Sequence, residues 1–304
     1  MNSQTKGHIA AITANLIFGA NYSIVKHITP RVIQPFGLNV VRVLVTVFLF
    51  WLLWFFNPKP IKVSRKDWGL FVICAAFGIA INQMLFVKGL SLTTSIHASL
   101  LGLATPVFIT IIAAVILKER LGIYKVAGLL SGIAGAAFLI LQKESTGSGE
   151  AVFIGNLFIV MNAISYAIFL VISRPLMTRY SPLWVLRIIF TFGTFMILPF
   201  GWEQFIAVDW PVLDTSEWLA IAFSAILSTF AAYLLNLFSL KYITSSANGT
   251  YIYTQPVFAA LVAIFFLGEQ LTVAKIFAAI LIFTGVYLVN KKKSETPQGN
   301  KKVA

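Results

Sequence analysis

The sequence predicts an all-α integral membrane protein with ten transmembrane helices, arranged as two inverted five-helix repeats. Three observations predict this fold class. Hydrophobic residues make up 59% of the 304 positions and charged residues only 11%, whereas soluble domains carry about 25% charged residues. The apolar residues gather in ten runs of transmembrane length. The second half of the chain repeats the first at an offset of 150 residues.

Each apolar run is about 20 residues long, which is the length that a helix needs to cross the hydrocarbon core. Backbone groups cannot stay unpaired in lipid, and the runs lack the two-residue alternation of barrel strands, so we expect helices. In chain order the predicted spans are 8–25, 36–56, 68–87, 96–117, 123–141, 152–172, 183–200, 218–238, 247–267 and 271–289. The remaining residues suffice for loops and tails but not for an extramembrane domain.

The basic residues predict the orientation of the spans. Sixteen lysines and arginines lie in tails and loops on the side of the N-terminus, and five lie in loops on the other side. The positive-inside rule therefore predicts a multi-pass protein of the cell (inner or plasma) membrane with both termini in the cytoplasm. This distribution explains the net charge of +13 without a nucleic-acid partner, because no soluble surface remains to carry a basic patch.

The chain also matches itself. Residues 105–125, TPVFITIIAAVILKERLGIYK, align with residues 255–275, QPVFAALVAIFFLGEQLTVAK, so that Pro106 falls on Pro256 and Glu119 on Glu269. Between residues 90 and 135, 12 of 46 positions are identical without a gap. We therefore expect a first repeat at 1–145 and a second at 146–304, which carries a basic cytoplasmic tail. Because five is odd, the copies have opposite orientations, as in many secondary transporters whose substrate site lies near the midplane.

These motifs resemble the drug/metabolite transporter superfamily, and specifically its ten-helix EamA-type members. The resemblance covers nearly the whole chain. It rests on the doubled Pro-to-Glu motif, on Arg42 in the second span, and on the segments GLSLTTSIHASL and SLKYITSSANGT before the fourth and ninth spans. It implies alternating-access transport of a small metabolite, commonly export, through a central cavity between the halves.

Polar residues inside the spans are the candidate substrate-binding residues. Residues three or four positions apart share a helix face, as Asn248, Tyr251 and Gln255 do just before Pro256. Proline cannot donate a backbone hydrogen bond, so we expect kinks at Pro106 and Pro256. The full candidate set is Asn15, Tyr22, Arg42, Asn82, His97, Asn162, Tyr166, Asn236, Asn248, Tyr251 and Gln255. The alternative is that these side chains only join helices through hydrogen bonds.

Three features leave alternatives open. Arg42 lies where an arginine is costly unless it pairs or reaches the interface. It either anchors a substrate carboxylate, makes a gate contact or extends to the outer interface. His97 could titrate near neutral pH, although a structural role is commoner for a lone histidine. The small residues Gly128, Gly132 and Gly135 form a close-packing face, within the monomer or at the seam of a homodimer.

The scarcity of buried acids narrows the function. No Asp or Glu lies in the middle of any span, which disfavours a proton-coupled exporter of lipophilic cations, since such a carrier would need a buried carboxylate. We expect a secondary transporter of a neutral or zwitterionic solute such as an amino acid, with no cofactor or metal. A permease for sugars, nucleosides or nucleotide-linked metabolites is the alternative. A channel or an intramembrane enzyme is the different-class alternative, and the enzyme is disfavoured because its catalytic motifs are missing.

Overall fold

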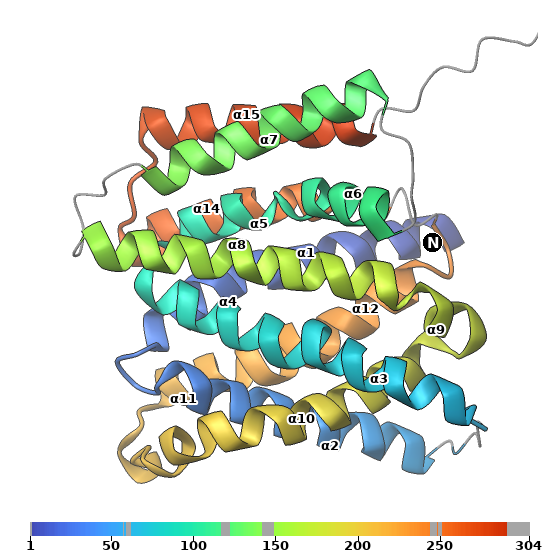
Figure 1. The fold of residues 1–304 in the computed structure, drawn as a ribbon. Helices are drawn as coiled ribbons and strands as arrows, with labels where there is room; N and C mark the ends of the chain where they lie inside the picture. The colour runs from blue at the N-terminus through green and yellow to red at the C-terminus, as the bar shows by residue number, and fades with distance from the viewer. Residues whose placement is uncertain are drawn as a thin grey trace, which may run out of the picture.

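The computed structural model describes residues 2–56, 58, 62–116, 122–141, 149–243, 248 and 251–290, and every regular element in these ranges is helical. Eight helical segments there are long and apolar enough to cross a membrane, and two shorter apolar helices, Tyr251–Leu267 and Val273–Val289, lie beside them (Figure 1). The predicted all-helical fold is confirmed. Glu119, the predicted boundary between residues 145 and 146, and the lysines of the C-terminal tail lie outside the described residues.

Five predicted spans are continuous helices: α1 (Ser3–Ile28), α2 (Pro35–Phe56), α7 (Ile123–Leu141), α8 (Gly149–Ile172) and α10 (Pro182–Ile206). A short helix that the sequence did not predict, α9 (Arg174–Arg179), connects α8 to α10. The tenth span is α15 (Val273–Asn290). The observed ends lie within six residues of the predicted ends, and the largest differences are at the start of α1 and the end of α10, where the helices continue past the apolar runs.

The other four spans change helix type or are interrupted along their length. The third span begins with the 3-10 turn η1 (Arg65–Asp67) and continues as α3 (Trp68–Ala75), the π-helical segment η2 (Ala76–Ala80) and α4 (Ile81–Leu92). The eighth consists of α11 (Thr215–Ala222), the π-helical segment η4 (Phe223–Ala231) and α12 (Ala232–Ser239). The fourth is divided into α5 (Ser95–Gly102) and α6 (Thr105–Ile116), and in the ninth η5 (Tyr251–Thr254) precedes α14 (Gln255–Leu267).

Several matching elements begin 150 residues apart, at Arg65 and Thr215, at Thr105 and Gln255, and at Ile123 and Val273. Pro106 and Pro256 each occupy the second position of a helix, α6 and α14 respectively. Proline fits there because an N–H in the first turn has no partner within the helix. Each proline therefore follows an interruption of its span instead of lying inside a continuous helix.

Figure 1 shows α7 with α15 at one edge of the bundle and α2 with α10 at the opposite edge. Glycines bring α7 and α15 together, because a Cβ on Gly128 would lie 2.6 Å from the Gly285 oxygen, and one on Gly135 would lie 3.0 Å from the Ala278 oxygen. Residues with increasing numbers on α7 contact residues with decreasing numbers on α15, so the two helices are antiparallel. The predicted small-residue face thus packs within the monomer.

Candidate functional site

The eleven candidate residues separate into groups. One group lies between α1, α12 and α14 and is linked by hydrogen bonds. The Gln255 amide donates to Asn15 Oδ1 (2.7 Å), Asn248 Nδ2 donates to Asn236 Oδ1 (3.2 Å), and the Tyr251 hydroxyl lies 2.9 Å from Nδ1 of His8. These are the interhelical bonds that the sequence left as the alternative to solute binding. The predicted polar stripe therefore joins the ninth span to its neighbours.

A second group joins α8 to the third and fourth spans. Asn82 and Asn162 exchange bonds, since each side-chain amide donates to the other residue's backbone oxygen, at 3.3 and 2.8 Å. His97 is fully buried, and its Nδ1 lies 3.3 Å from Nδ2 of Asn156. Because an amide nitrogen can only donate, Nδ1 is the acceptor and the ring proton sits on Nε2. Asn156 in turn accepts from the Thr93 hydroxyl (2.5 Å), so His97 belongs to a hydrogen-bonded helix contact.

The glutamate of the Pro-to-Glu motif has a structural partner that the sequence did not reveal. Glu269 follows α14, and its two carboxylate oxygens accept from the backbone nitrogens of Ser95 (2.7 Å) and Ile96 (3.1 Å) at the start of α5. A carboxylate there stabilises the helix by satisfying free N–H groups and by its interaction with the helix dipole. The motif thus ties the ninth span to the fourth.

The third group surrounds Arg42, which is only 6% exposed. Its Nε donates to the Thr229 hydroxyl (2.9 Å) in η4, and its guanidinium lies 6.0 Å from the centre of the Phe86 ring. Nη1 has no hydrogen-bond partner among the described residues. Arg42 does not extend to an exposed surface, which removes one of its three predicted roles. A buried guanidinium without an anionic partner is costly, so this charge needs a counter-ion.

Other buried polar atoms near Arg42 also lack a hydrogen-bond partner in the described part of the chain. Asn39 lies one turn earlier on α2 and donates to the backbone oxygen of Gln83 (3.2 Å), and the side-chain oxygens of both residues lack a partner. Ser224, whose backbone oxygen accepts from Thr229, has an unpartnered hydroxyl. Leaving such atoms unpaired costs about 1–3 kcal/mol each. Arg42, Asn39, Gln83 and Ser224, which we name the central polar cluster, thus each carry one buried polar atom without a partner among the described residues.

Three aromatic pairs lie on α1, α4, α8 and α12. Tyr22 meets Phe86 edge to face with ring centres 5.2 Å apart, and Phe18 meets Tyr233 in the same way at 5.8 Å. Tyr166 and Phe169, both on α8, have ring centres 5.8 Å apart and ring planes tilted by 32°. Of the candidate set, Tyr22 and Arg42 are thus joined through Phe86. Arg42 was predicted from its charge inside a span, whereas Asn39, Gln83 and Ser224 were missed, although Asn39 shares a helix face with Arg42 at a spacing of three.

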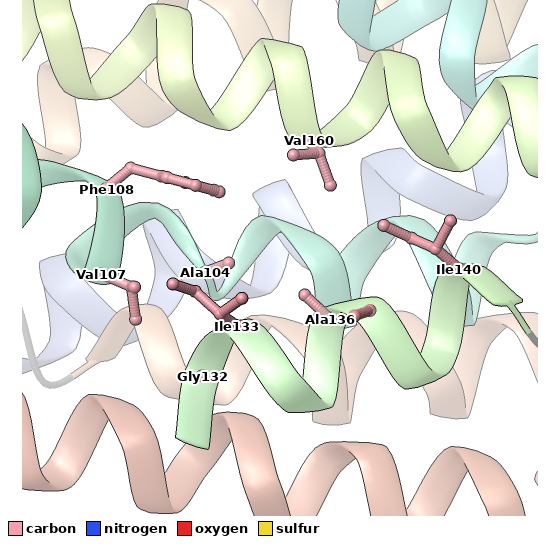
Figure 2. A pocket seen from close by; sticks show the side chains of 9 residues that line it. Ala104, Val107, Phe108, Gly132, Ile133, Ala136, Ile140 and Val160 are labelled. Carbon is pink, nitrogen blue, oxygen red and sulfur yellow. The ribbon is translucent and has the colours of Figure 1, made fainter. Parts of the chain in front are cut away.

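Figure 2 shows a separate groove of about 270 Å³ between α6, α7 and α8. Its lining is apolar: Ala104, Val107, Phe108, Gly132, Ile133, Ala136, Ala137, Ile140 and Val160. None of the eleven candidates lines it, and it offers no hydrogen-bonding side chain to a polar solute. Within the described ranges no three His, Cys, Asp or Glu side chains lie close enough together to hold a metal ion.

Comparison with known proteins is consistent with this architecture. A relative from Archaeoglobus fulgidus, named as an uncharacterized transporter, is 24% identical over 97% of this chain and 100% of its own length. A protein of Streptantibioticus cattleyicolor named "Probable terminal-alkyne amino-acid exporter" is 27% identical over 77% of each chain. One crystal structure superposes with a TM-score of 0.61 at 20% identity, covering 94% of this chain and 96% of that one.

The family comparison covers both halves of the chain. The sequence profile of the EamA-like transporter family matches twice, at residues 5–141 and again at 153–291. Together these matches take in all ten apolar segments, which makes the chain a multi-pass membrane protein and a transporter rather than an enzyme. The chain therefore belongs to the EamA-like transporter family.

Proposed function

We propose that this protein is a secondary transporter that exports an amino acid or a related zwitterionic solute across the cell membrane by alternating access. The observation that carries the proposal is the buried Nη1 of Arg42, which has no hydrogen-bond partner among the described residues and belongs to the central polar cluster. A solute carboxylate would accept hydrogen bonds from Arg42 and neutralise its charge. The free oxygens of Asn39 and Gln83 are acceptors, as the ammonium of an amino acid requires.

The proposal includes an inverted duplication, with repeats at 1–145 and 146–304 and both termini in the cytoplasm. It is supported by the double family match, by elements that begin 150 residues apart, and by the antiparallel packing of the corresponding helices α7 and α15. The excess of basic residues on the side of the N-terminus supports the orientation. The relative named as an amino-acid exporter supports the solute class and the direction.

A permease for sugars or nucleosides is the second candidate. Hydroxyl-rich solutes would satisfy the acceptor oxygens of the central polar cluster, and the amide and tyrosine side chains around it suit them. They would leave the charge of Arg42 uncompensated, however, which is costly in a buried site. Nucleotide-linked metabolites carry phosphate and would pair with Arg42, so the test must include them.

The test is counterflow exchange in liposomes that contain the full-length protein, with amino acids, their methyl esters, sugars, nucleosides and a nucleotide sugar as competitors. We expect saturable exchange of an amino acid, no competition by its methyl ester, and a loss of about 10- to 150-fold in apparent affinity for R42Q. That range corresponds to the 1.5–3 kcal/mol of a charged hydrogen bond.

R187Q is the matched control. Arg187 is also buried, at 4% exposed, but its Nε donates to the Phe50 oxygen (3.1 Å) and its guanidinium stacks on Trp51 and Trp184. This variant should lose thermal stability without changing the preference for acid over ester. Equal transport of acid and ester by the wild type would overturn the proposed solute class, and a conductance that does not saturate would overturn the carrier mechanism.

A further inference from the structure

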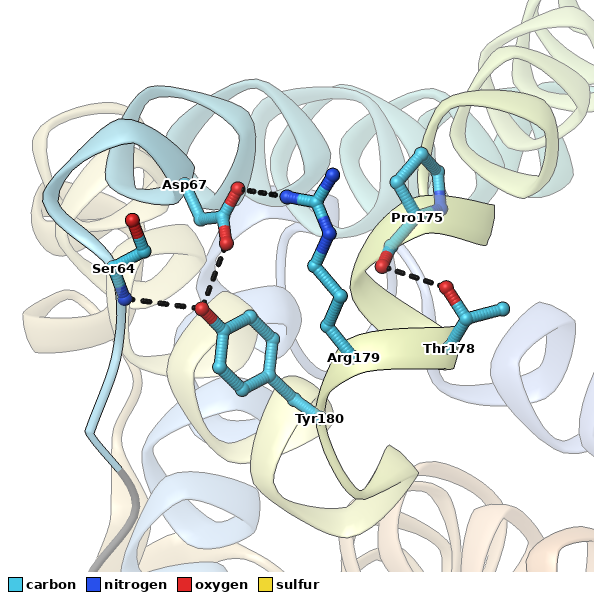
Figure 3. Close-up of polar contacts among 6 residues, drawn as sticks. All are labelled: Ser64, Asp67, Pro175, Thr178, Arg179 and Tyr180. Atoms are coloured by element: carbon cyan, nitrogen blue, oxygen red, sulfur yellow. Dashed lines mark hydrogen bonds and ion pairs between the residues drawn. The ribbon is translucent and has the colours of Figure 1, made fainter.

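An ion pair joins the two halves of the chain at the end of the bundle where α1 begins. Asp67, in η1, accepts from Nη1 of Arg179 (2.5 Å) and from the hydroxyl of Tyr180 (2.7 Å), as Figure 3 shows. The backbone nitrogen of Ser64 donates to the same hydroxyl (3.0 Å). Arg179 ends α9 in the second half, whereas Ser64 and Asp67 precede α3 in the first. We name the contact of Asp67 with Arg179 and Tyr180 the Asp67 latch.

A second ion pair joins the halves at the opposite end. Nη2 of Arg31, in the connection between α1 and α2, lies 3.2 Å from Oε1 of Glu217 in the first turn of α11. The other oxygen of Glu217 accepts from the backbone nitrogen of Asp214 (3.2 Å) in a capping box, which holds the carboxylate at the helix start. We name the pair of Arg31 and Glu217 the Glu217 latch.

The two latches occupy matching places in the two halves. Asp67 and Glu217 are 150 residues apart, and each is followed by a tryptophan, Trp68 and Trp218. Each arginine lies in the connection between the first and second spans of its own half and pairs with an acid at the start of the third span of the other half. The two pairs are also similarly exposed to solvent. The carboxylate side chains are 7% and 16% exposed, and the arginine side chains are 58% and 59% exposed.

We propose that these ion pairs are a pair of alternating gates, one at each end, and that each breaks when its own end of the bundle opens. The proposal rests on the alternating-access cycle of the proposed function. Both pairs are formed in this structure, so both ends are held. Because one partner of each pair faces solvent, the contact is weak enough to break in every cycle. Loss of one pair then shifts the population toward opening at that end and away from opening at the other.

The latches are not equal. Asp67 accepts from two residues of the second half, whereas the second oxygen of Glu217 is used within its own helix start. The Asp67 latch therefore has one more bond between the halves than the Glu217 latch. D67N should shift the population more than E217Q does.

The experiment is hydrogen–deuterium exchange of the full-length protein in lipid nanodiscs, which needs no knowledge of the solute. D67N should raise exchange by about 2- to 5-fold near Asp67 and α9, the range expected for an exposed ion pair, and lower it near Arg31 and α11. E217Q should do the reverse, and R31E/E217R should restore the wild-type pattern. R174Q is the control, because Arg174 is an exposed arginine of the same α9.

A reciprocal change at the far end distinguishes a gate from a local tie. If D67N and E217Q each raise exchange only at their own end, the pairs are structural contacts and the gate proposal is wrong. Failure of the solute proposal would leave this result untouched, since exchange is measured without a solute. If neither end of the bundle changes its exchange in any variant, the ion pairs do not hold the ends closed and the gate proposal is wrong, whereas the transport proposal is tested separately by counterflow.

Discussion

The glycine contact between α7 and α15 allows a quantitative test of the packing. A Cβ on Gly285 would lie 2.5 Å from the Gly132 nitrogen and 2.7 Å from the Gly128 oxygen. Both are backbone atoms, which cannot rotate away as a side chain can, so G285A requires the two helices to separate. Overpacking of this kind costs about 1–3 kcal/mol.

G69A is the matched control, because a Cβ on Gly69 in the first turn of α3 meets nothing within 4 Å. Alanine replaces glycine in a helix in both variants, a gain of up to about 1 kcal/mol, so the difference between them reports the packing cost. At about 2–4 °C per kcal/mol, G285A should unfold roughly 2–12 °C below G69A when tryptophan fluorescence is followed during heating in detergent.

Equal unfolding midpoints for G285A and G69A would refute the backbone contact. The same experiment addresses the homodimer that the small-residue face left open. If this face joined two copies, G285A would change the mass that light scattering measures. Packing within the monomer predicts an unchanged mass and a lower midpoint.

Two further contacts give separate predictions. N82A and N162A should each lower the free energy of unfolding by about 0.6–2 kcal/mol, and the two losses should add, because each amide donates to a backbone oxygen that the other substitution leaves in place; an unchanged stability in both variants would contradict the pairing. E269Q should lower the free energy of unfolding by about 0.5–2 kcal/mol, because the amide offers only one acceptor oxygen to the start of α5. E150Q, at the exposed first turn of α8, is its control, and an equal loss there would show that Glu269 has no special role.

Much of the fold follows from the sequence because the bilayer imposes a simple length rule. The predicted span 123–141 coincides with α7, and the predicted 36–56 differs from α2 by one residue. The length rule could not predict the π-helical segments. Their residues are as apolar as those of the neighbouring α-helices, and the change from α- to π-type hydrogen bonding does not alter the periodicity of apolar residues in the sequence. The interruption before Pro106 was predicted only as a kink.

The site was less predictable, because hydrogen-bond partners come from different helices. Asn248, Tyr251 and Gln255 were predicted to share one face of a continuous helix, but Tyr251 lies in η5 and Gln255 begins α14. Their side chains bond to residues of α1 and α12. The acids and arginines of the latches lie in loops and first turns, where composition does not separate a gate from a solvated charge. Their only signal in the sequence is the Asp-Trp and Glu-Trp pair at the repeat offset of 150.

The placement of charge links the two proposals. Acidic residues stand only near the ends of the spans, where Asp67 and Glu217 have arginine partners. Arg42 lies between these ends, in the central polar cluster, and no carboxylate of the described chain pairs with it. A carboxylate built into the chain beside Arg42 would satisfy the guanidinium permanently and leave nothing for a solute to contribute. A solute carboxylate can instead enter, pair and leave, provided that one end opens at a time, and this is the condition that two weak ion pairs at opposite ends would meet.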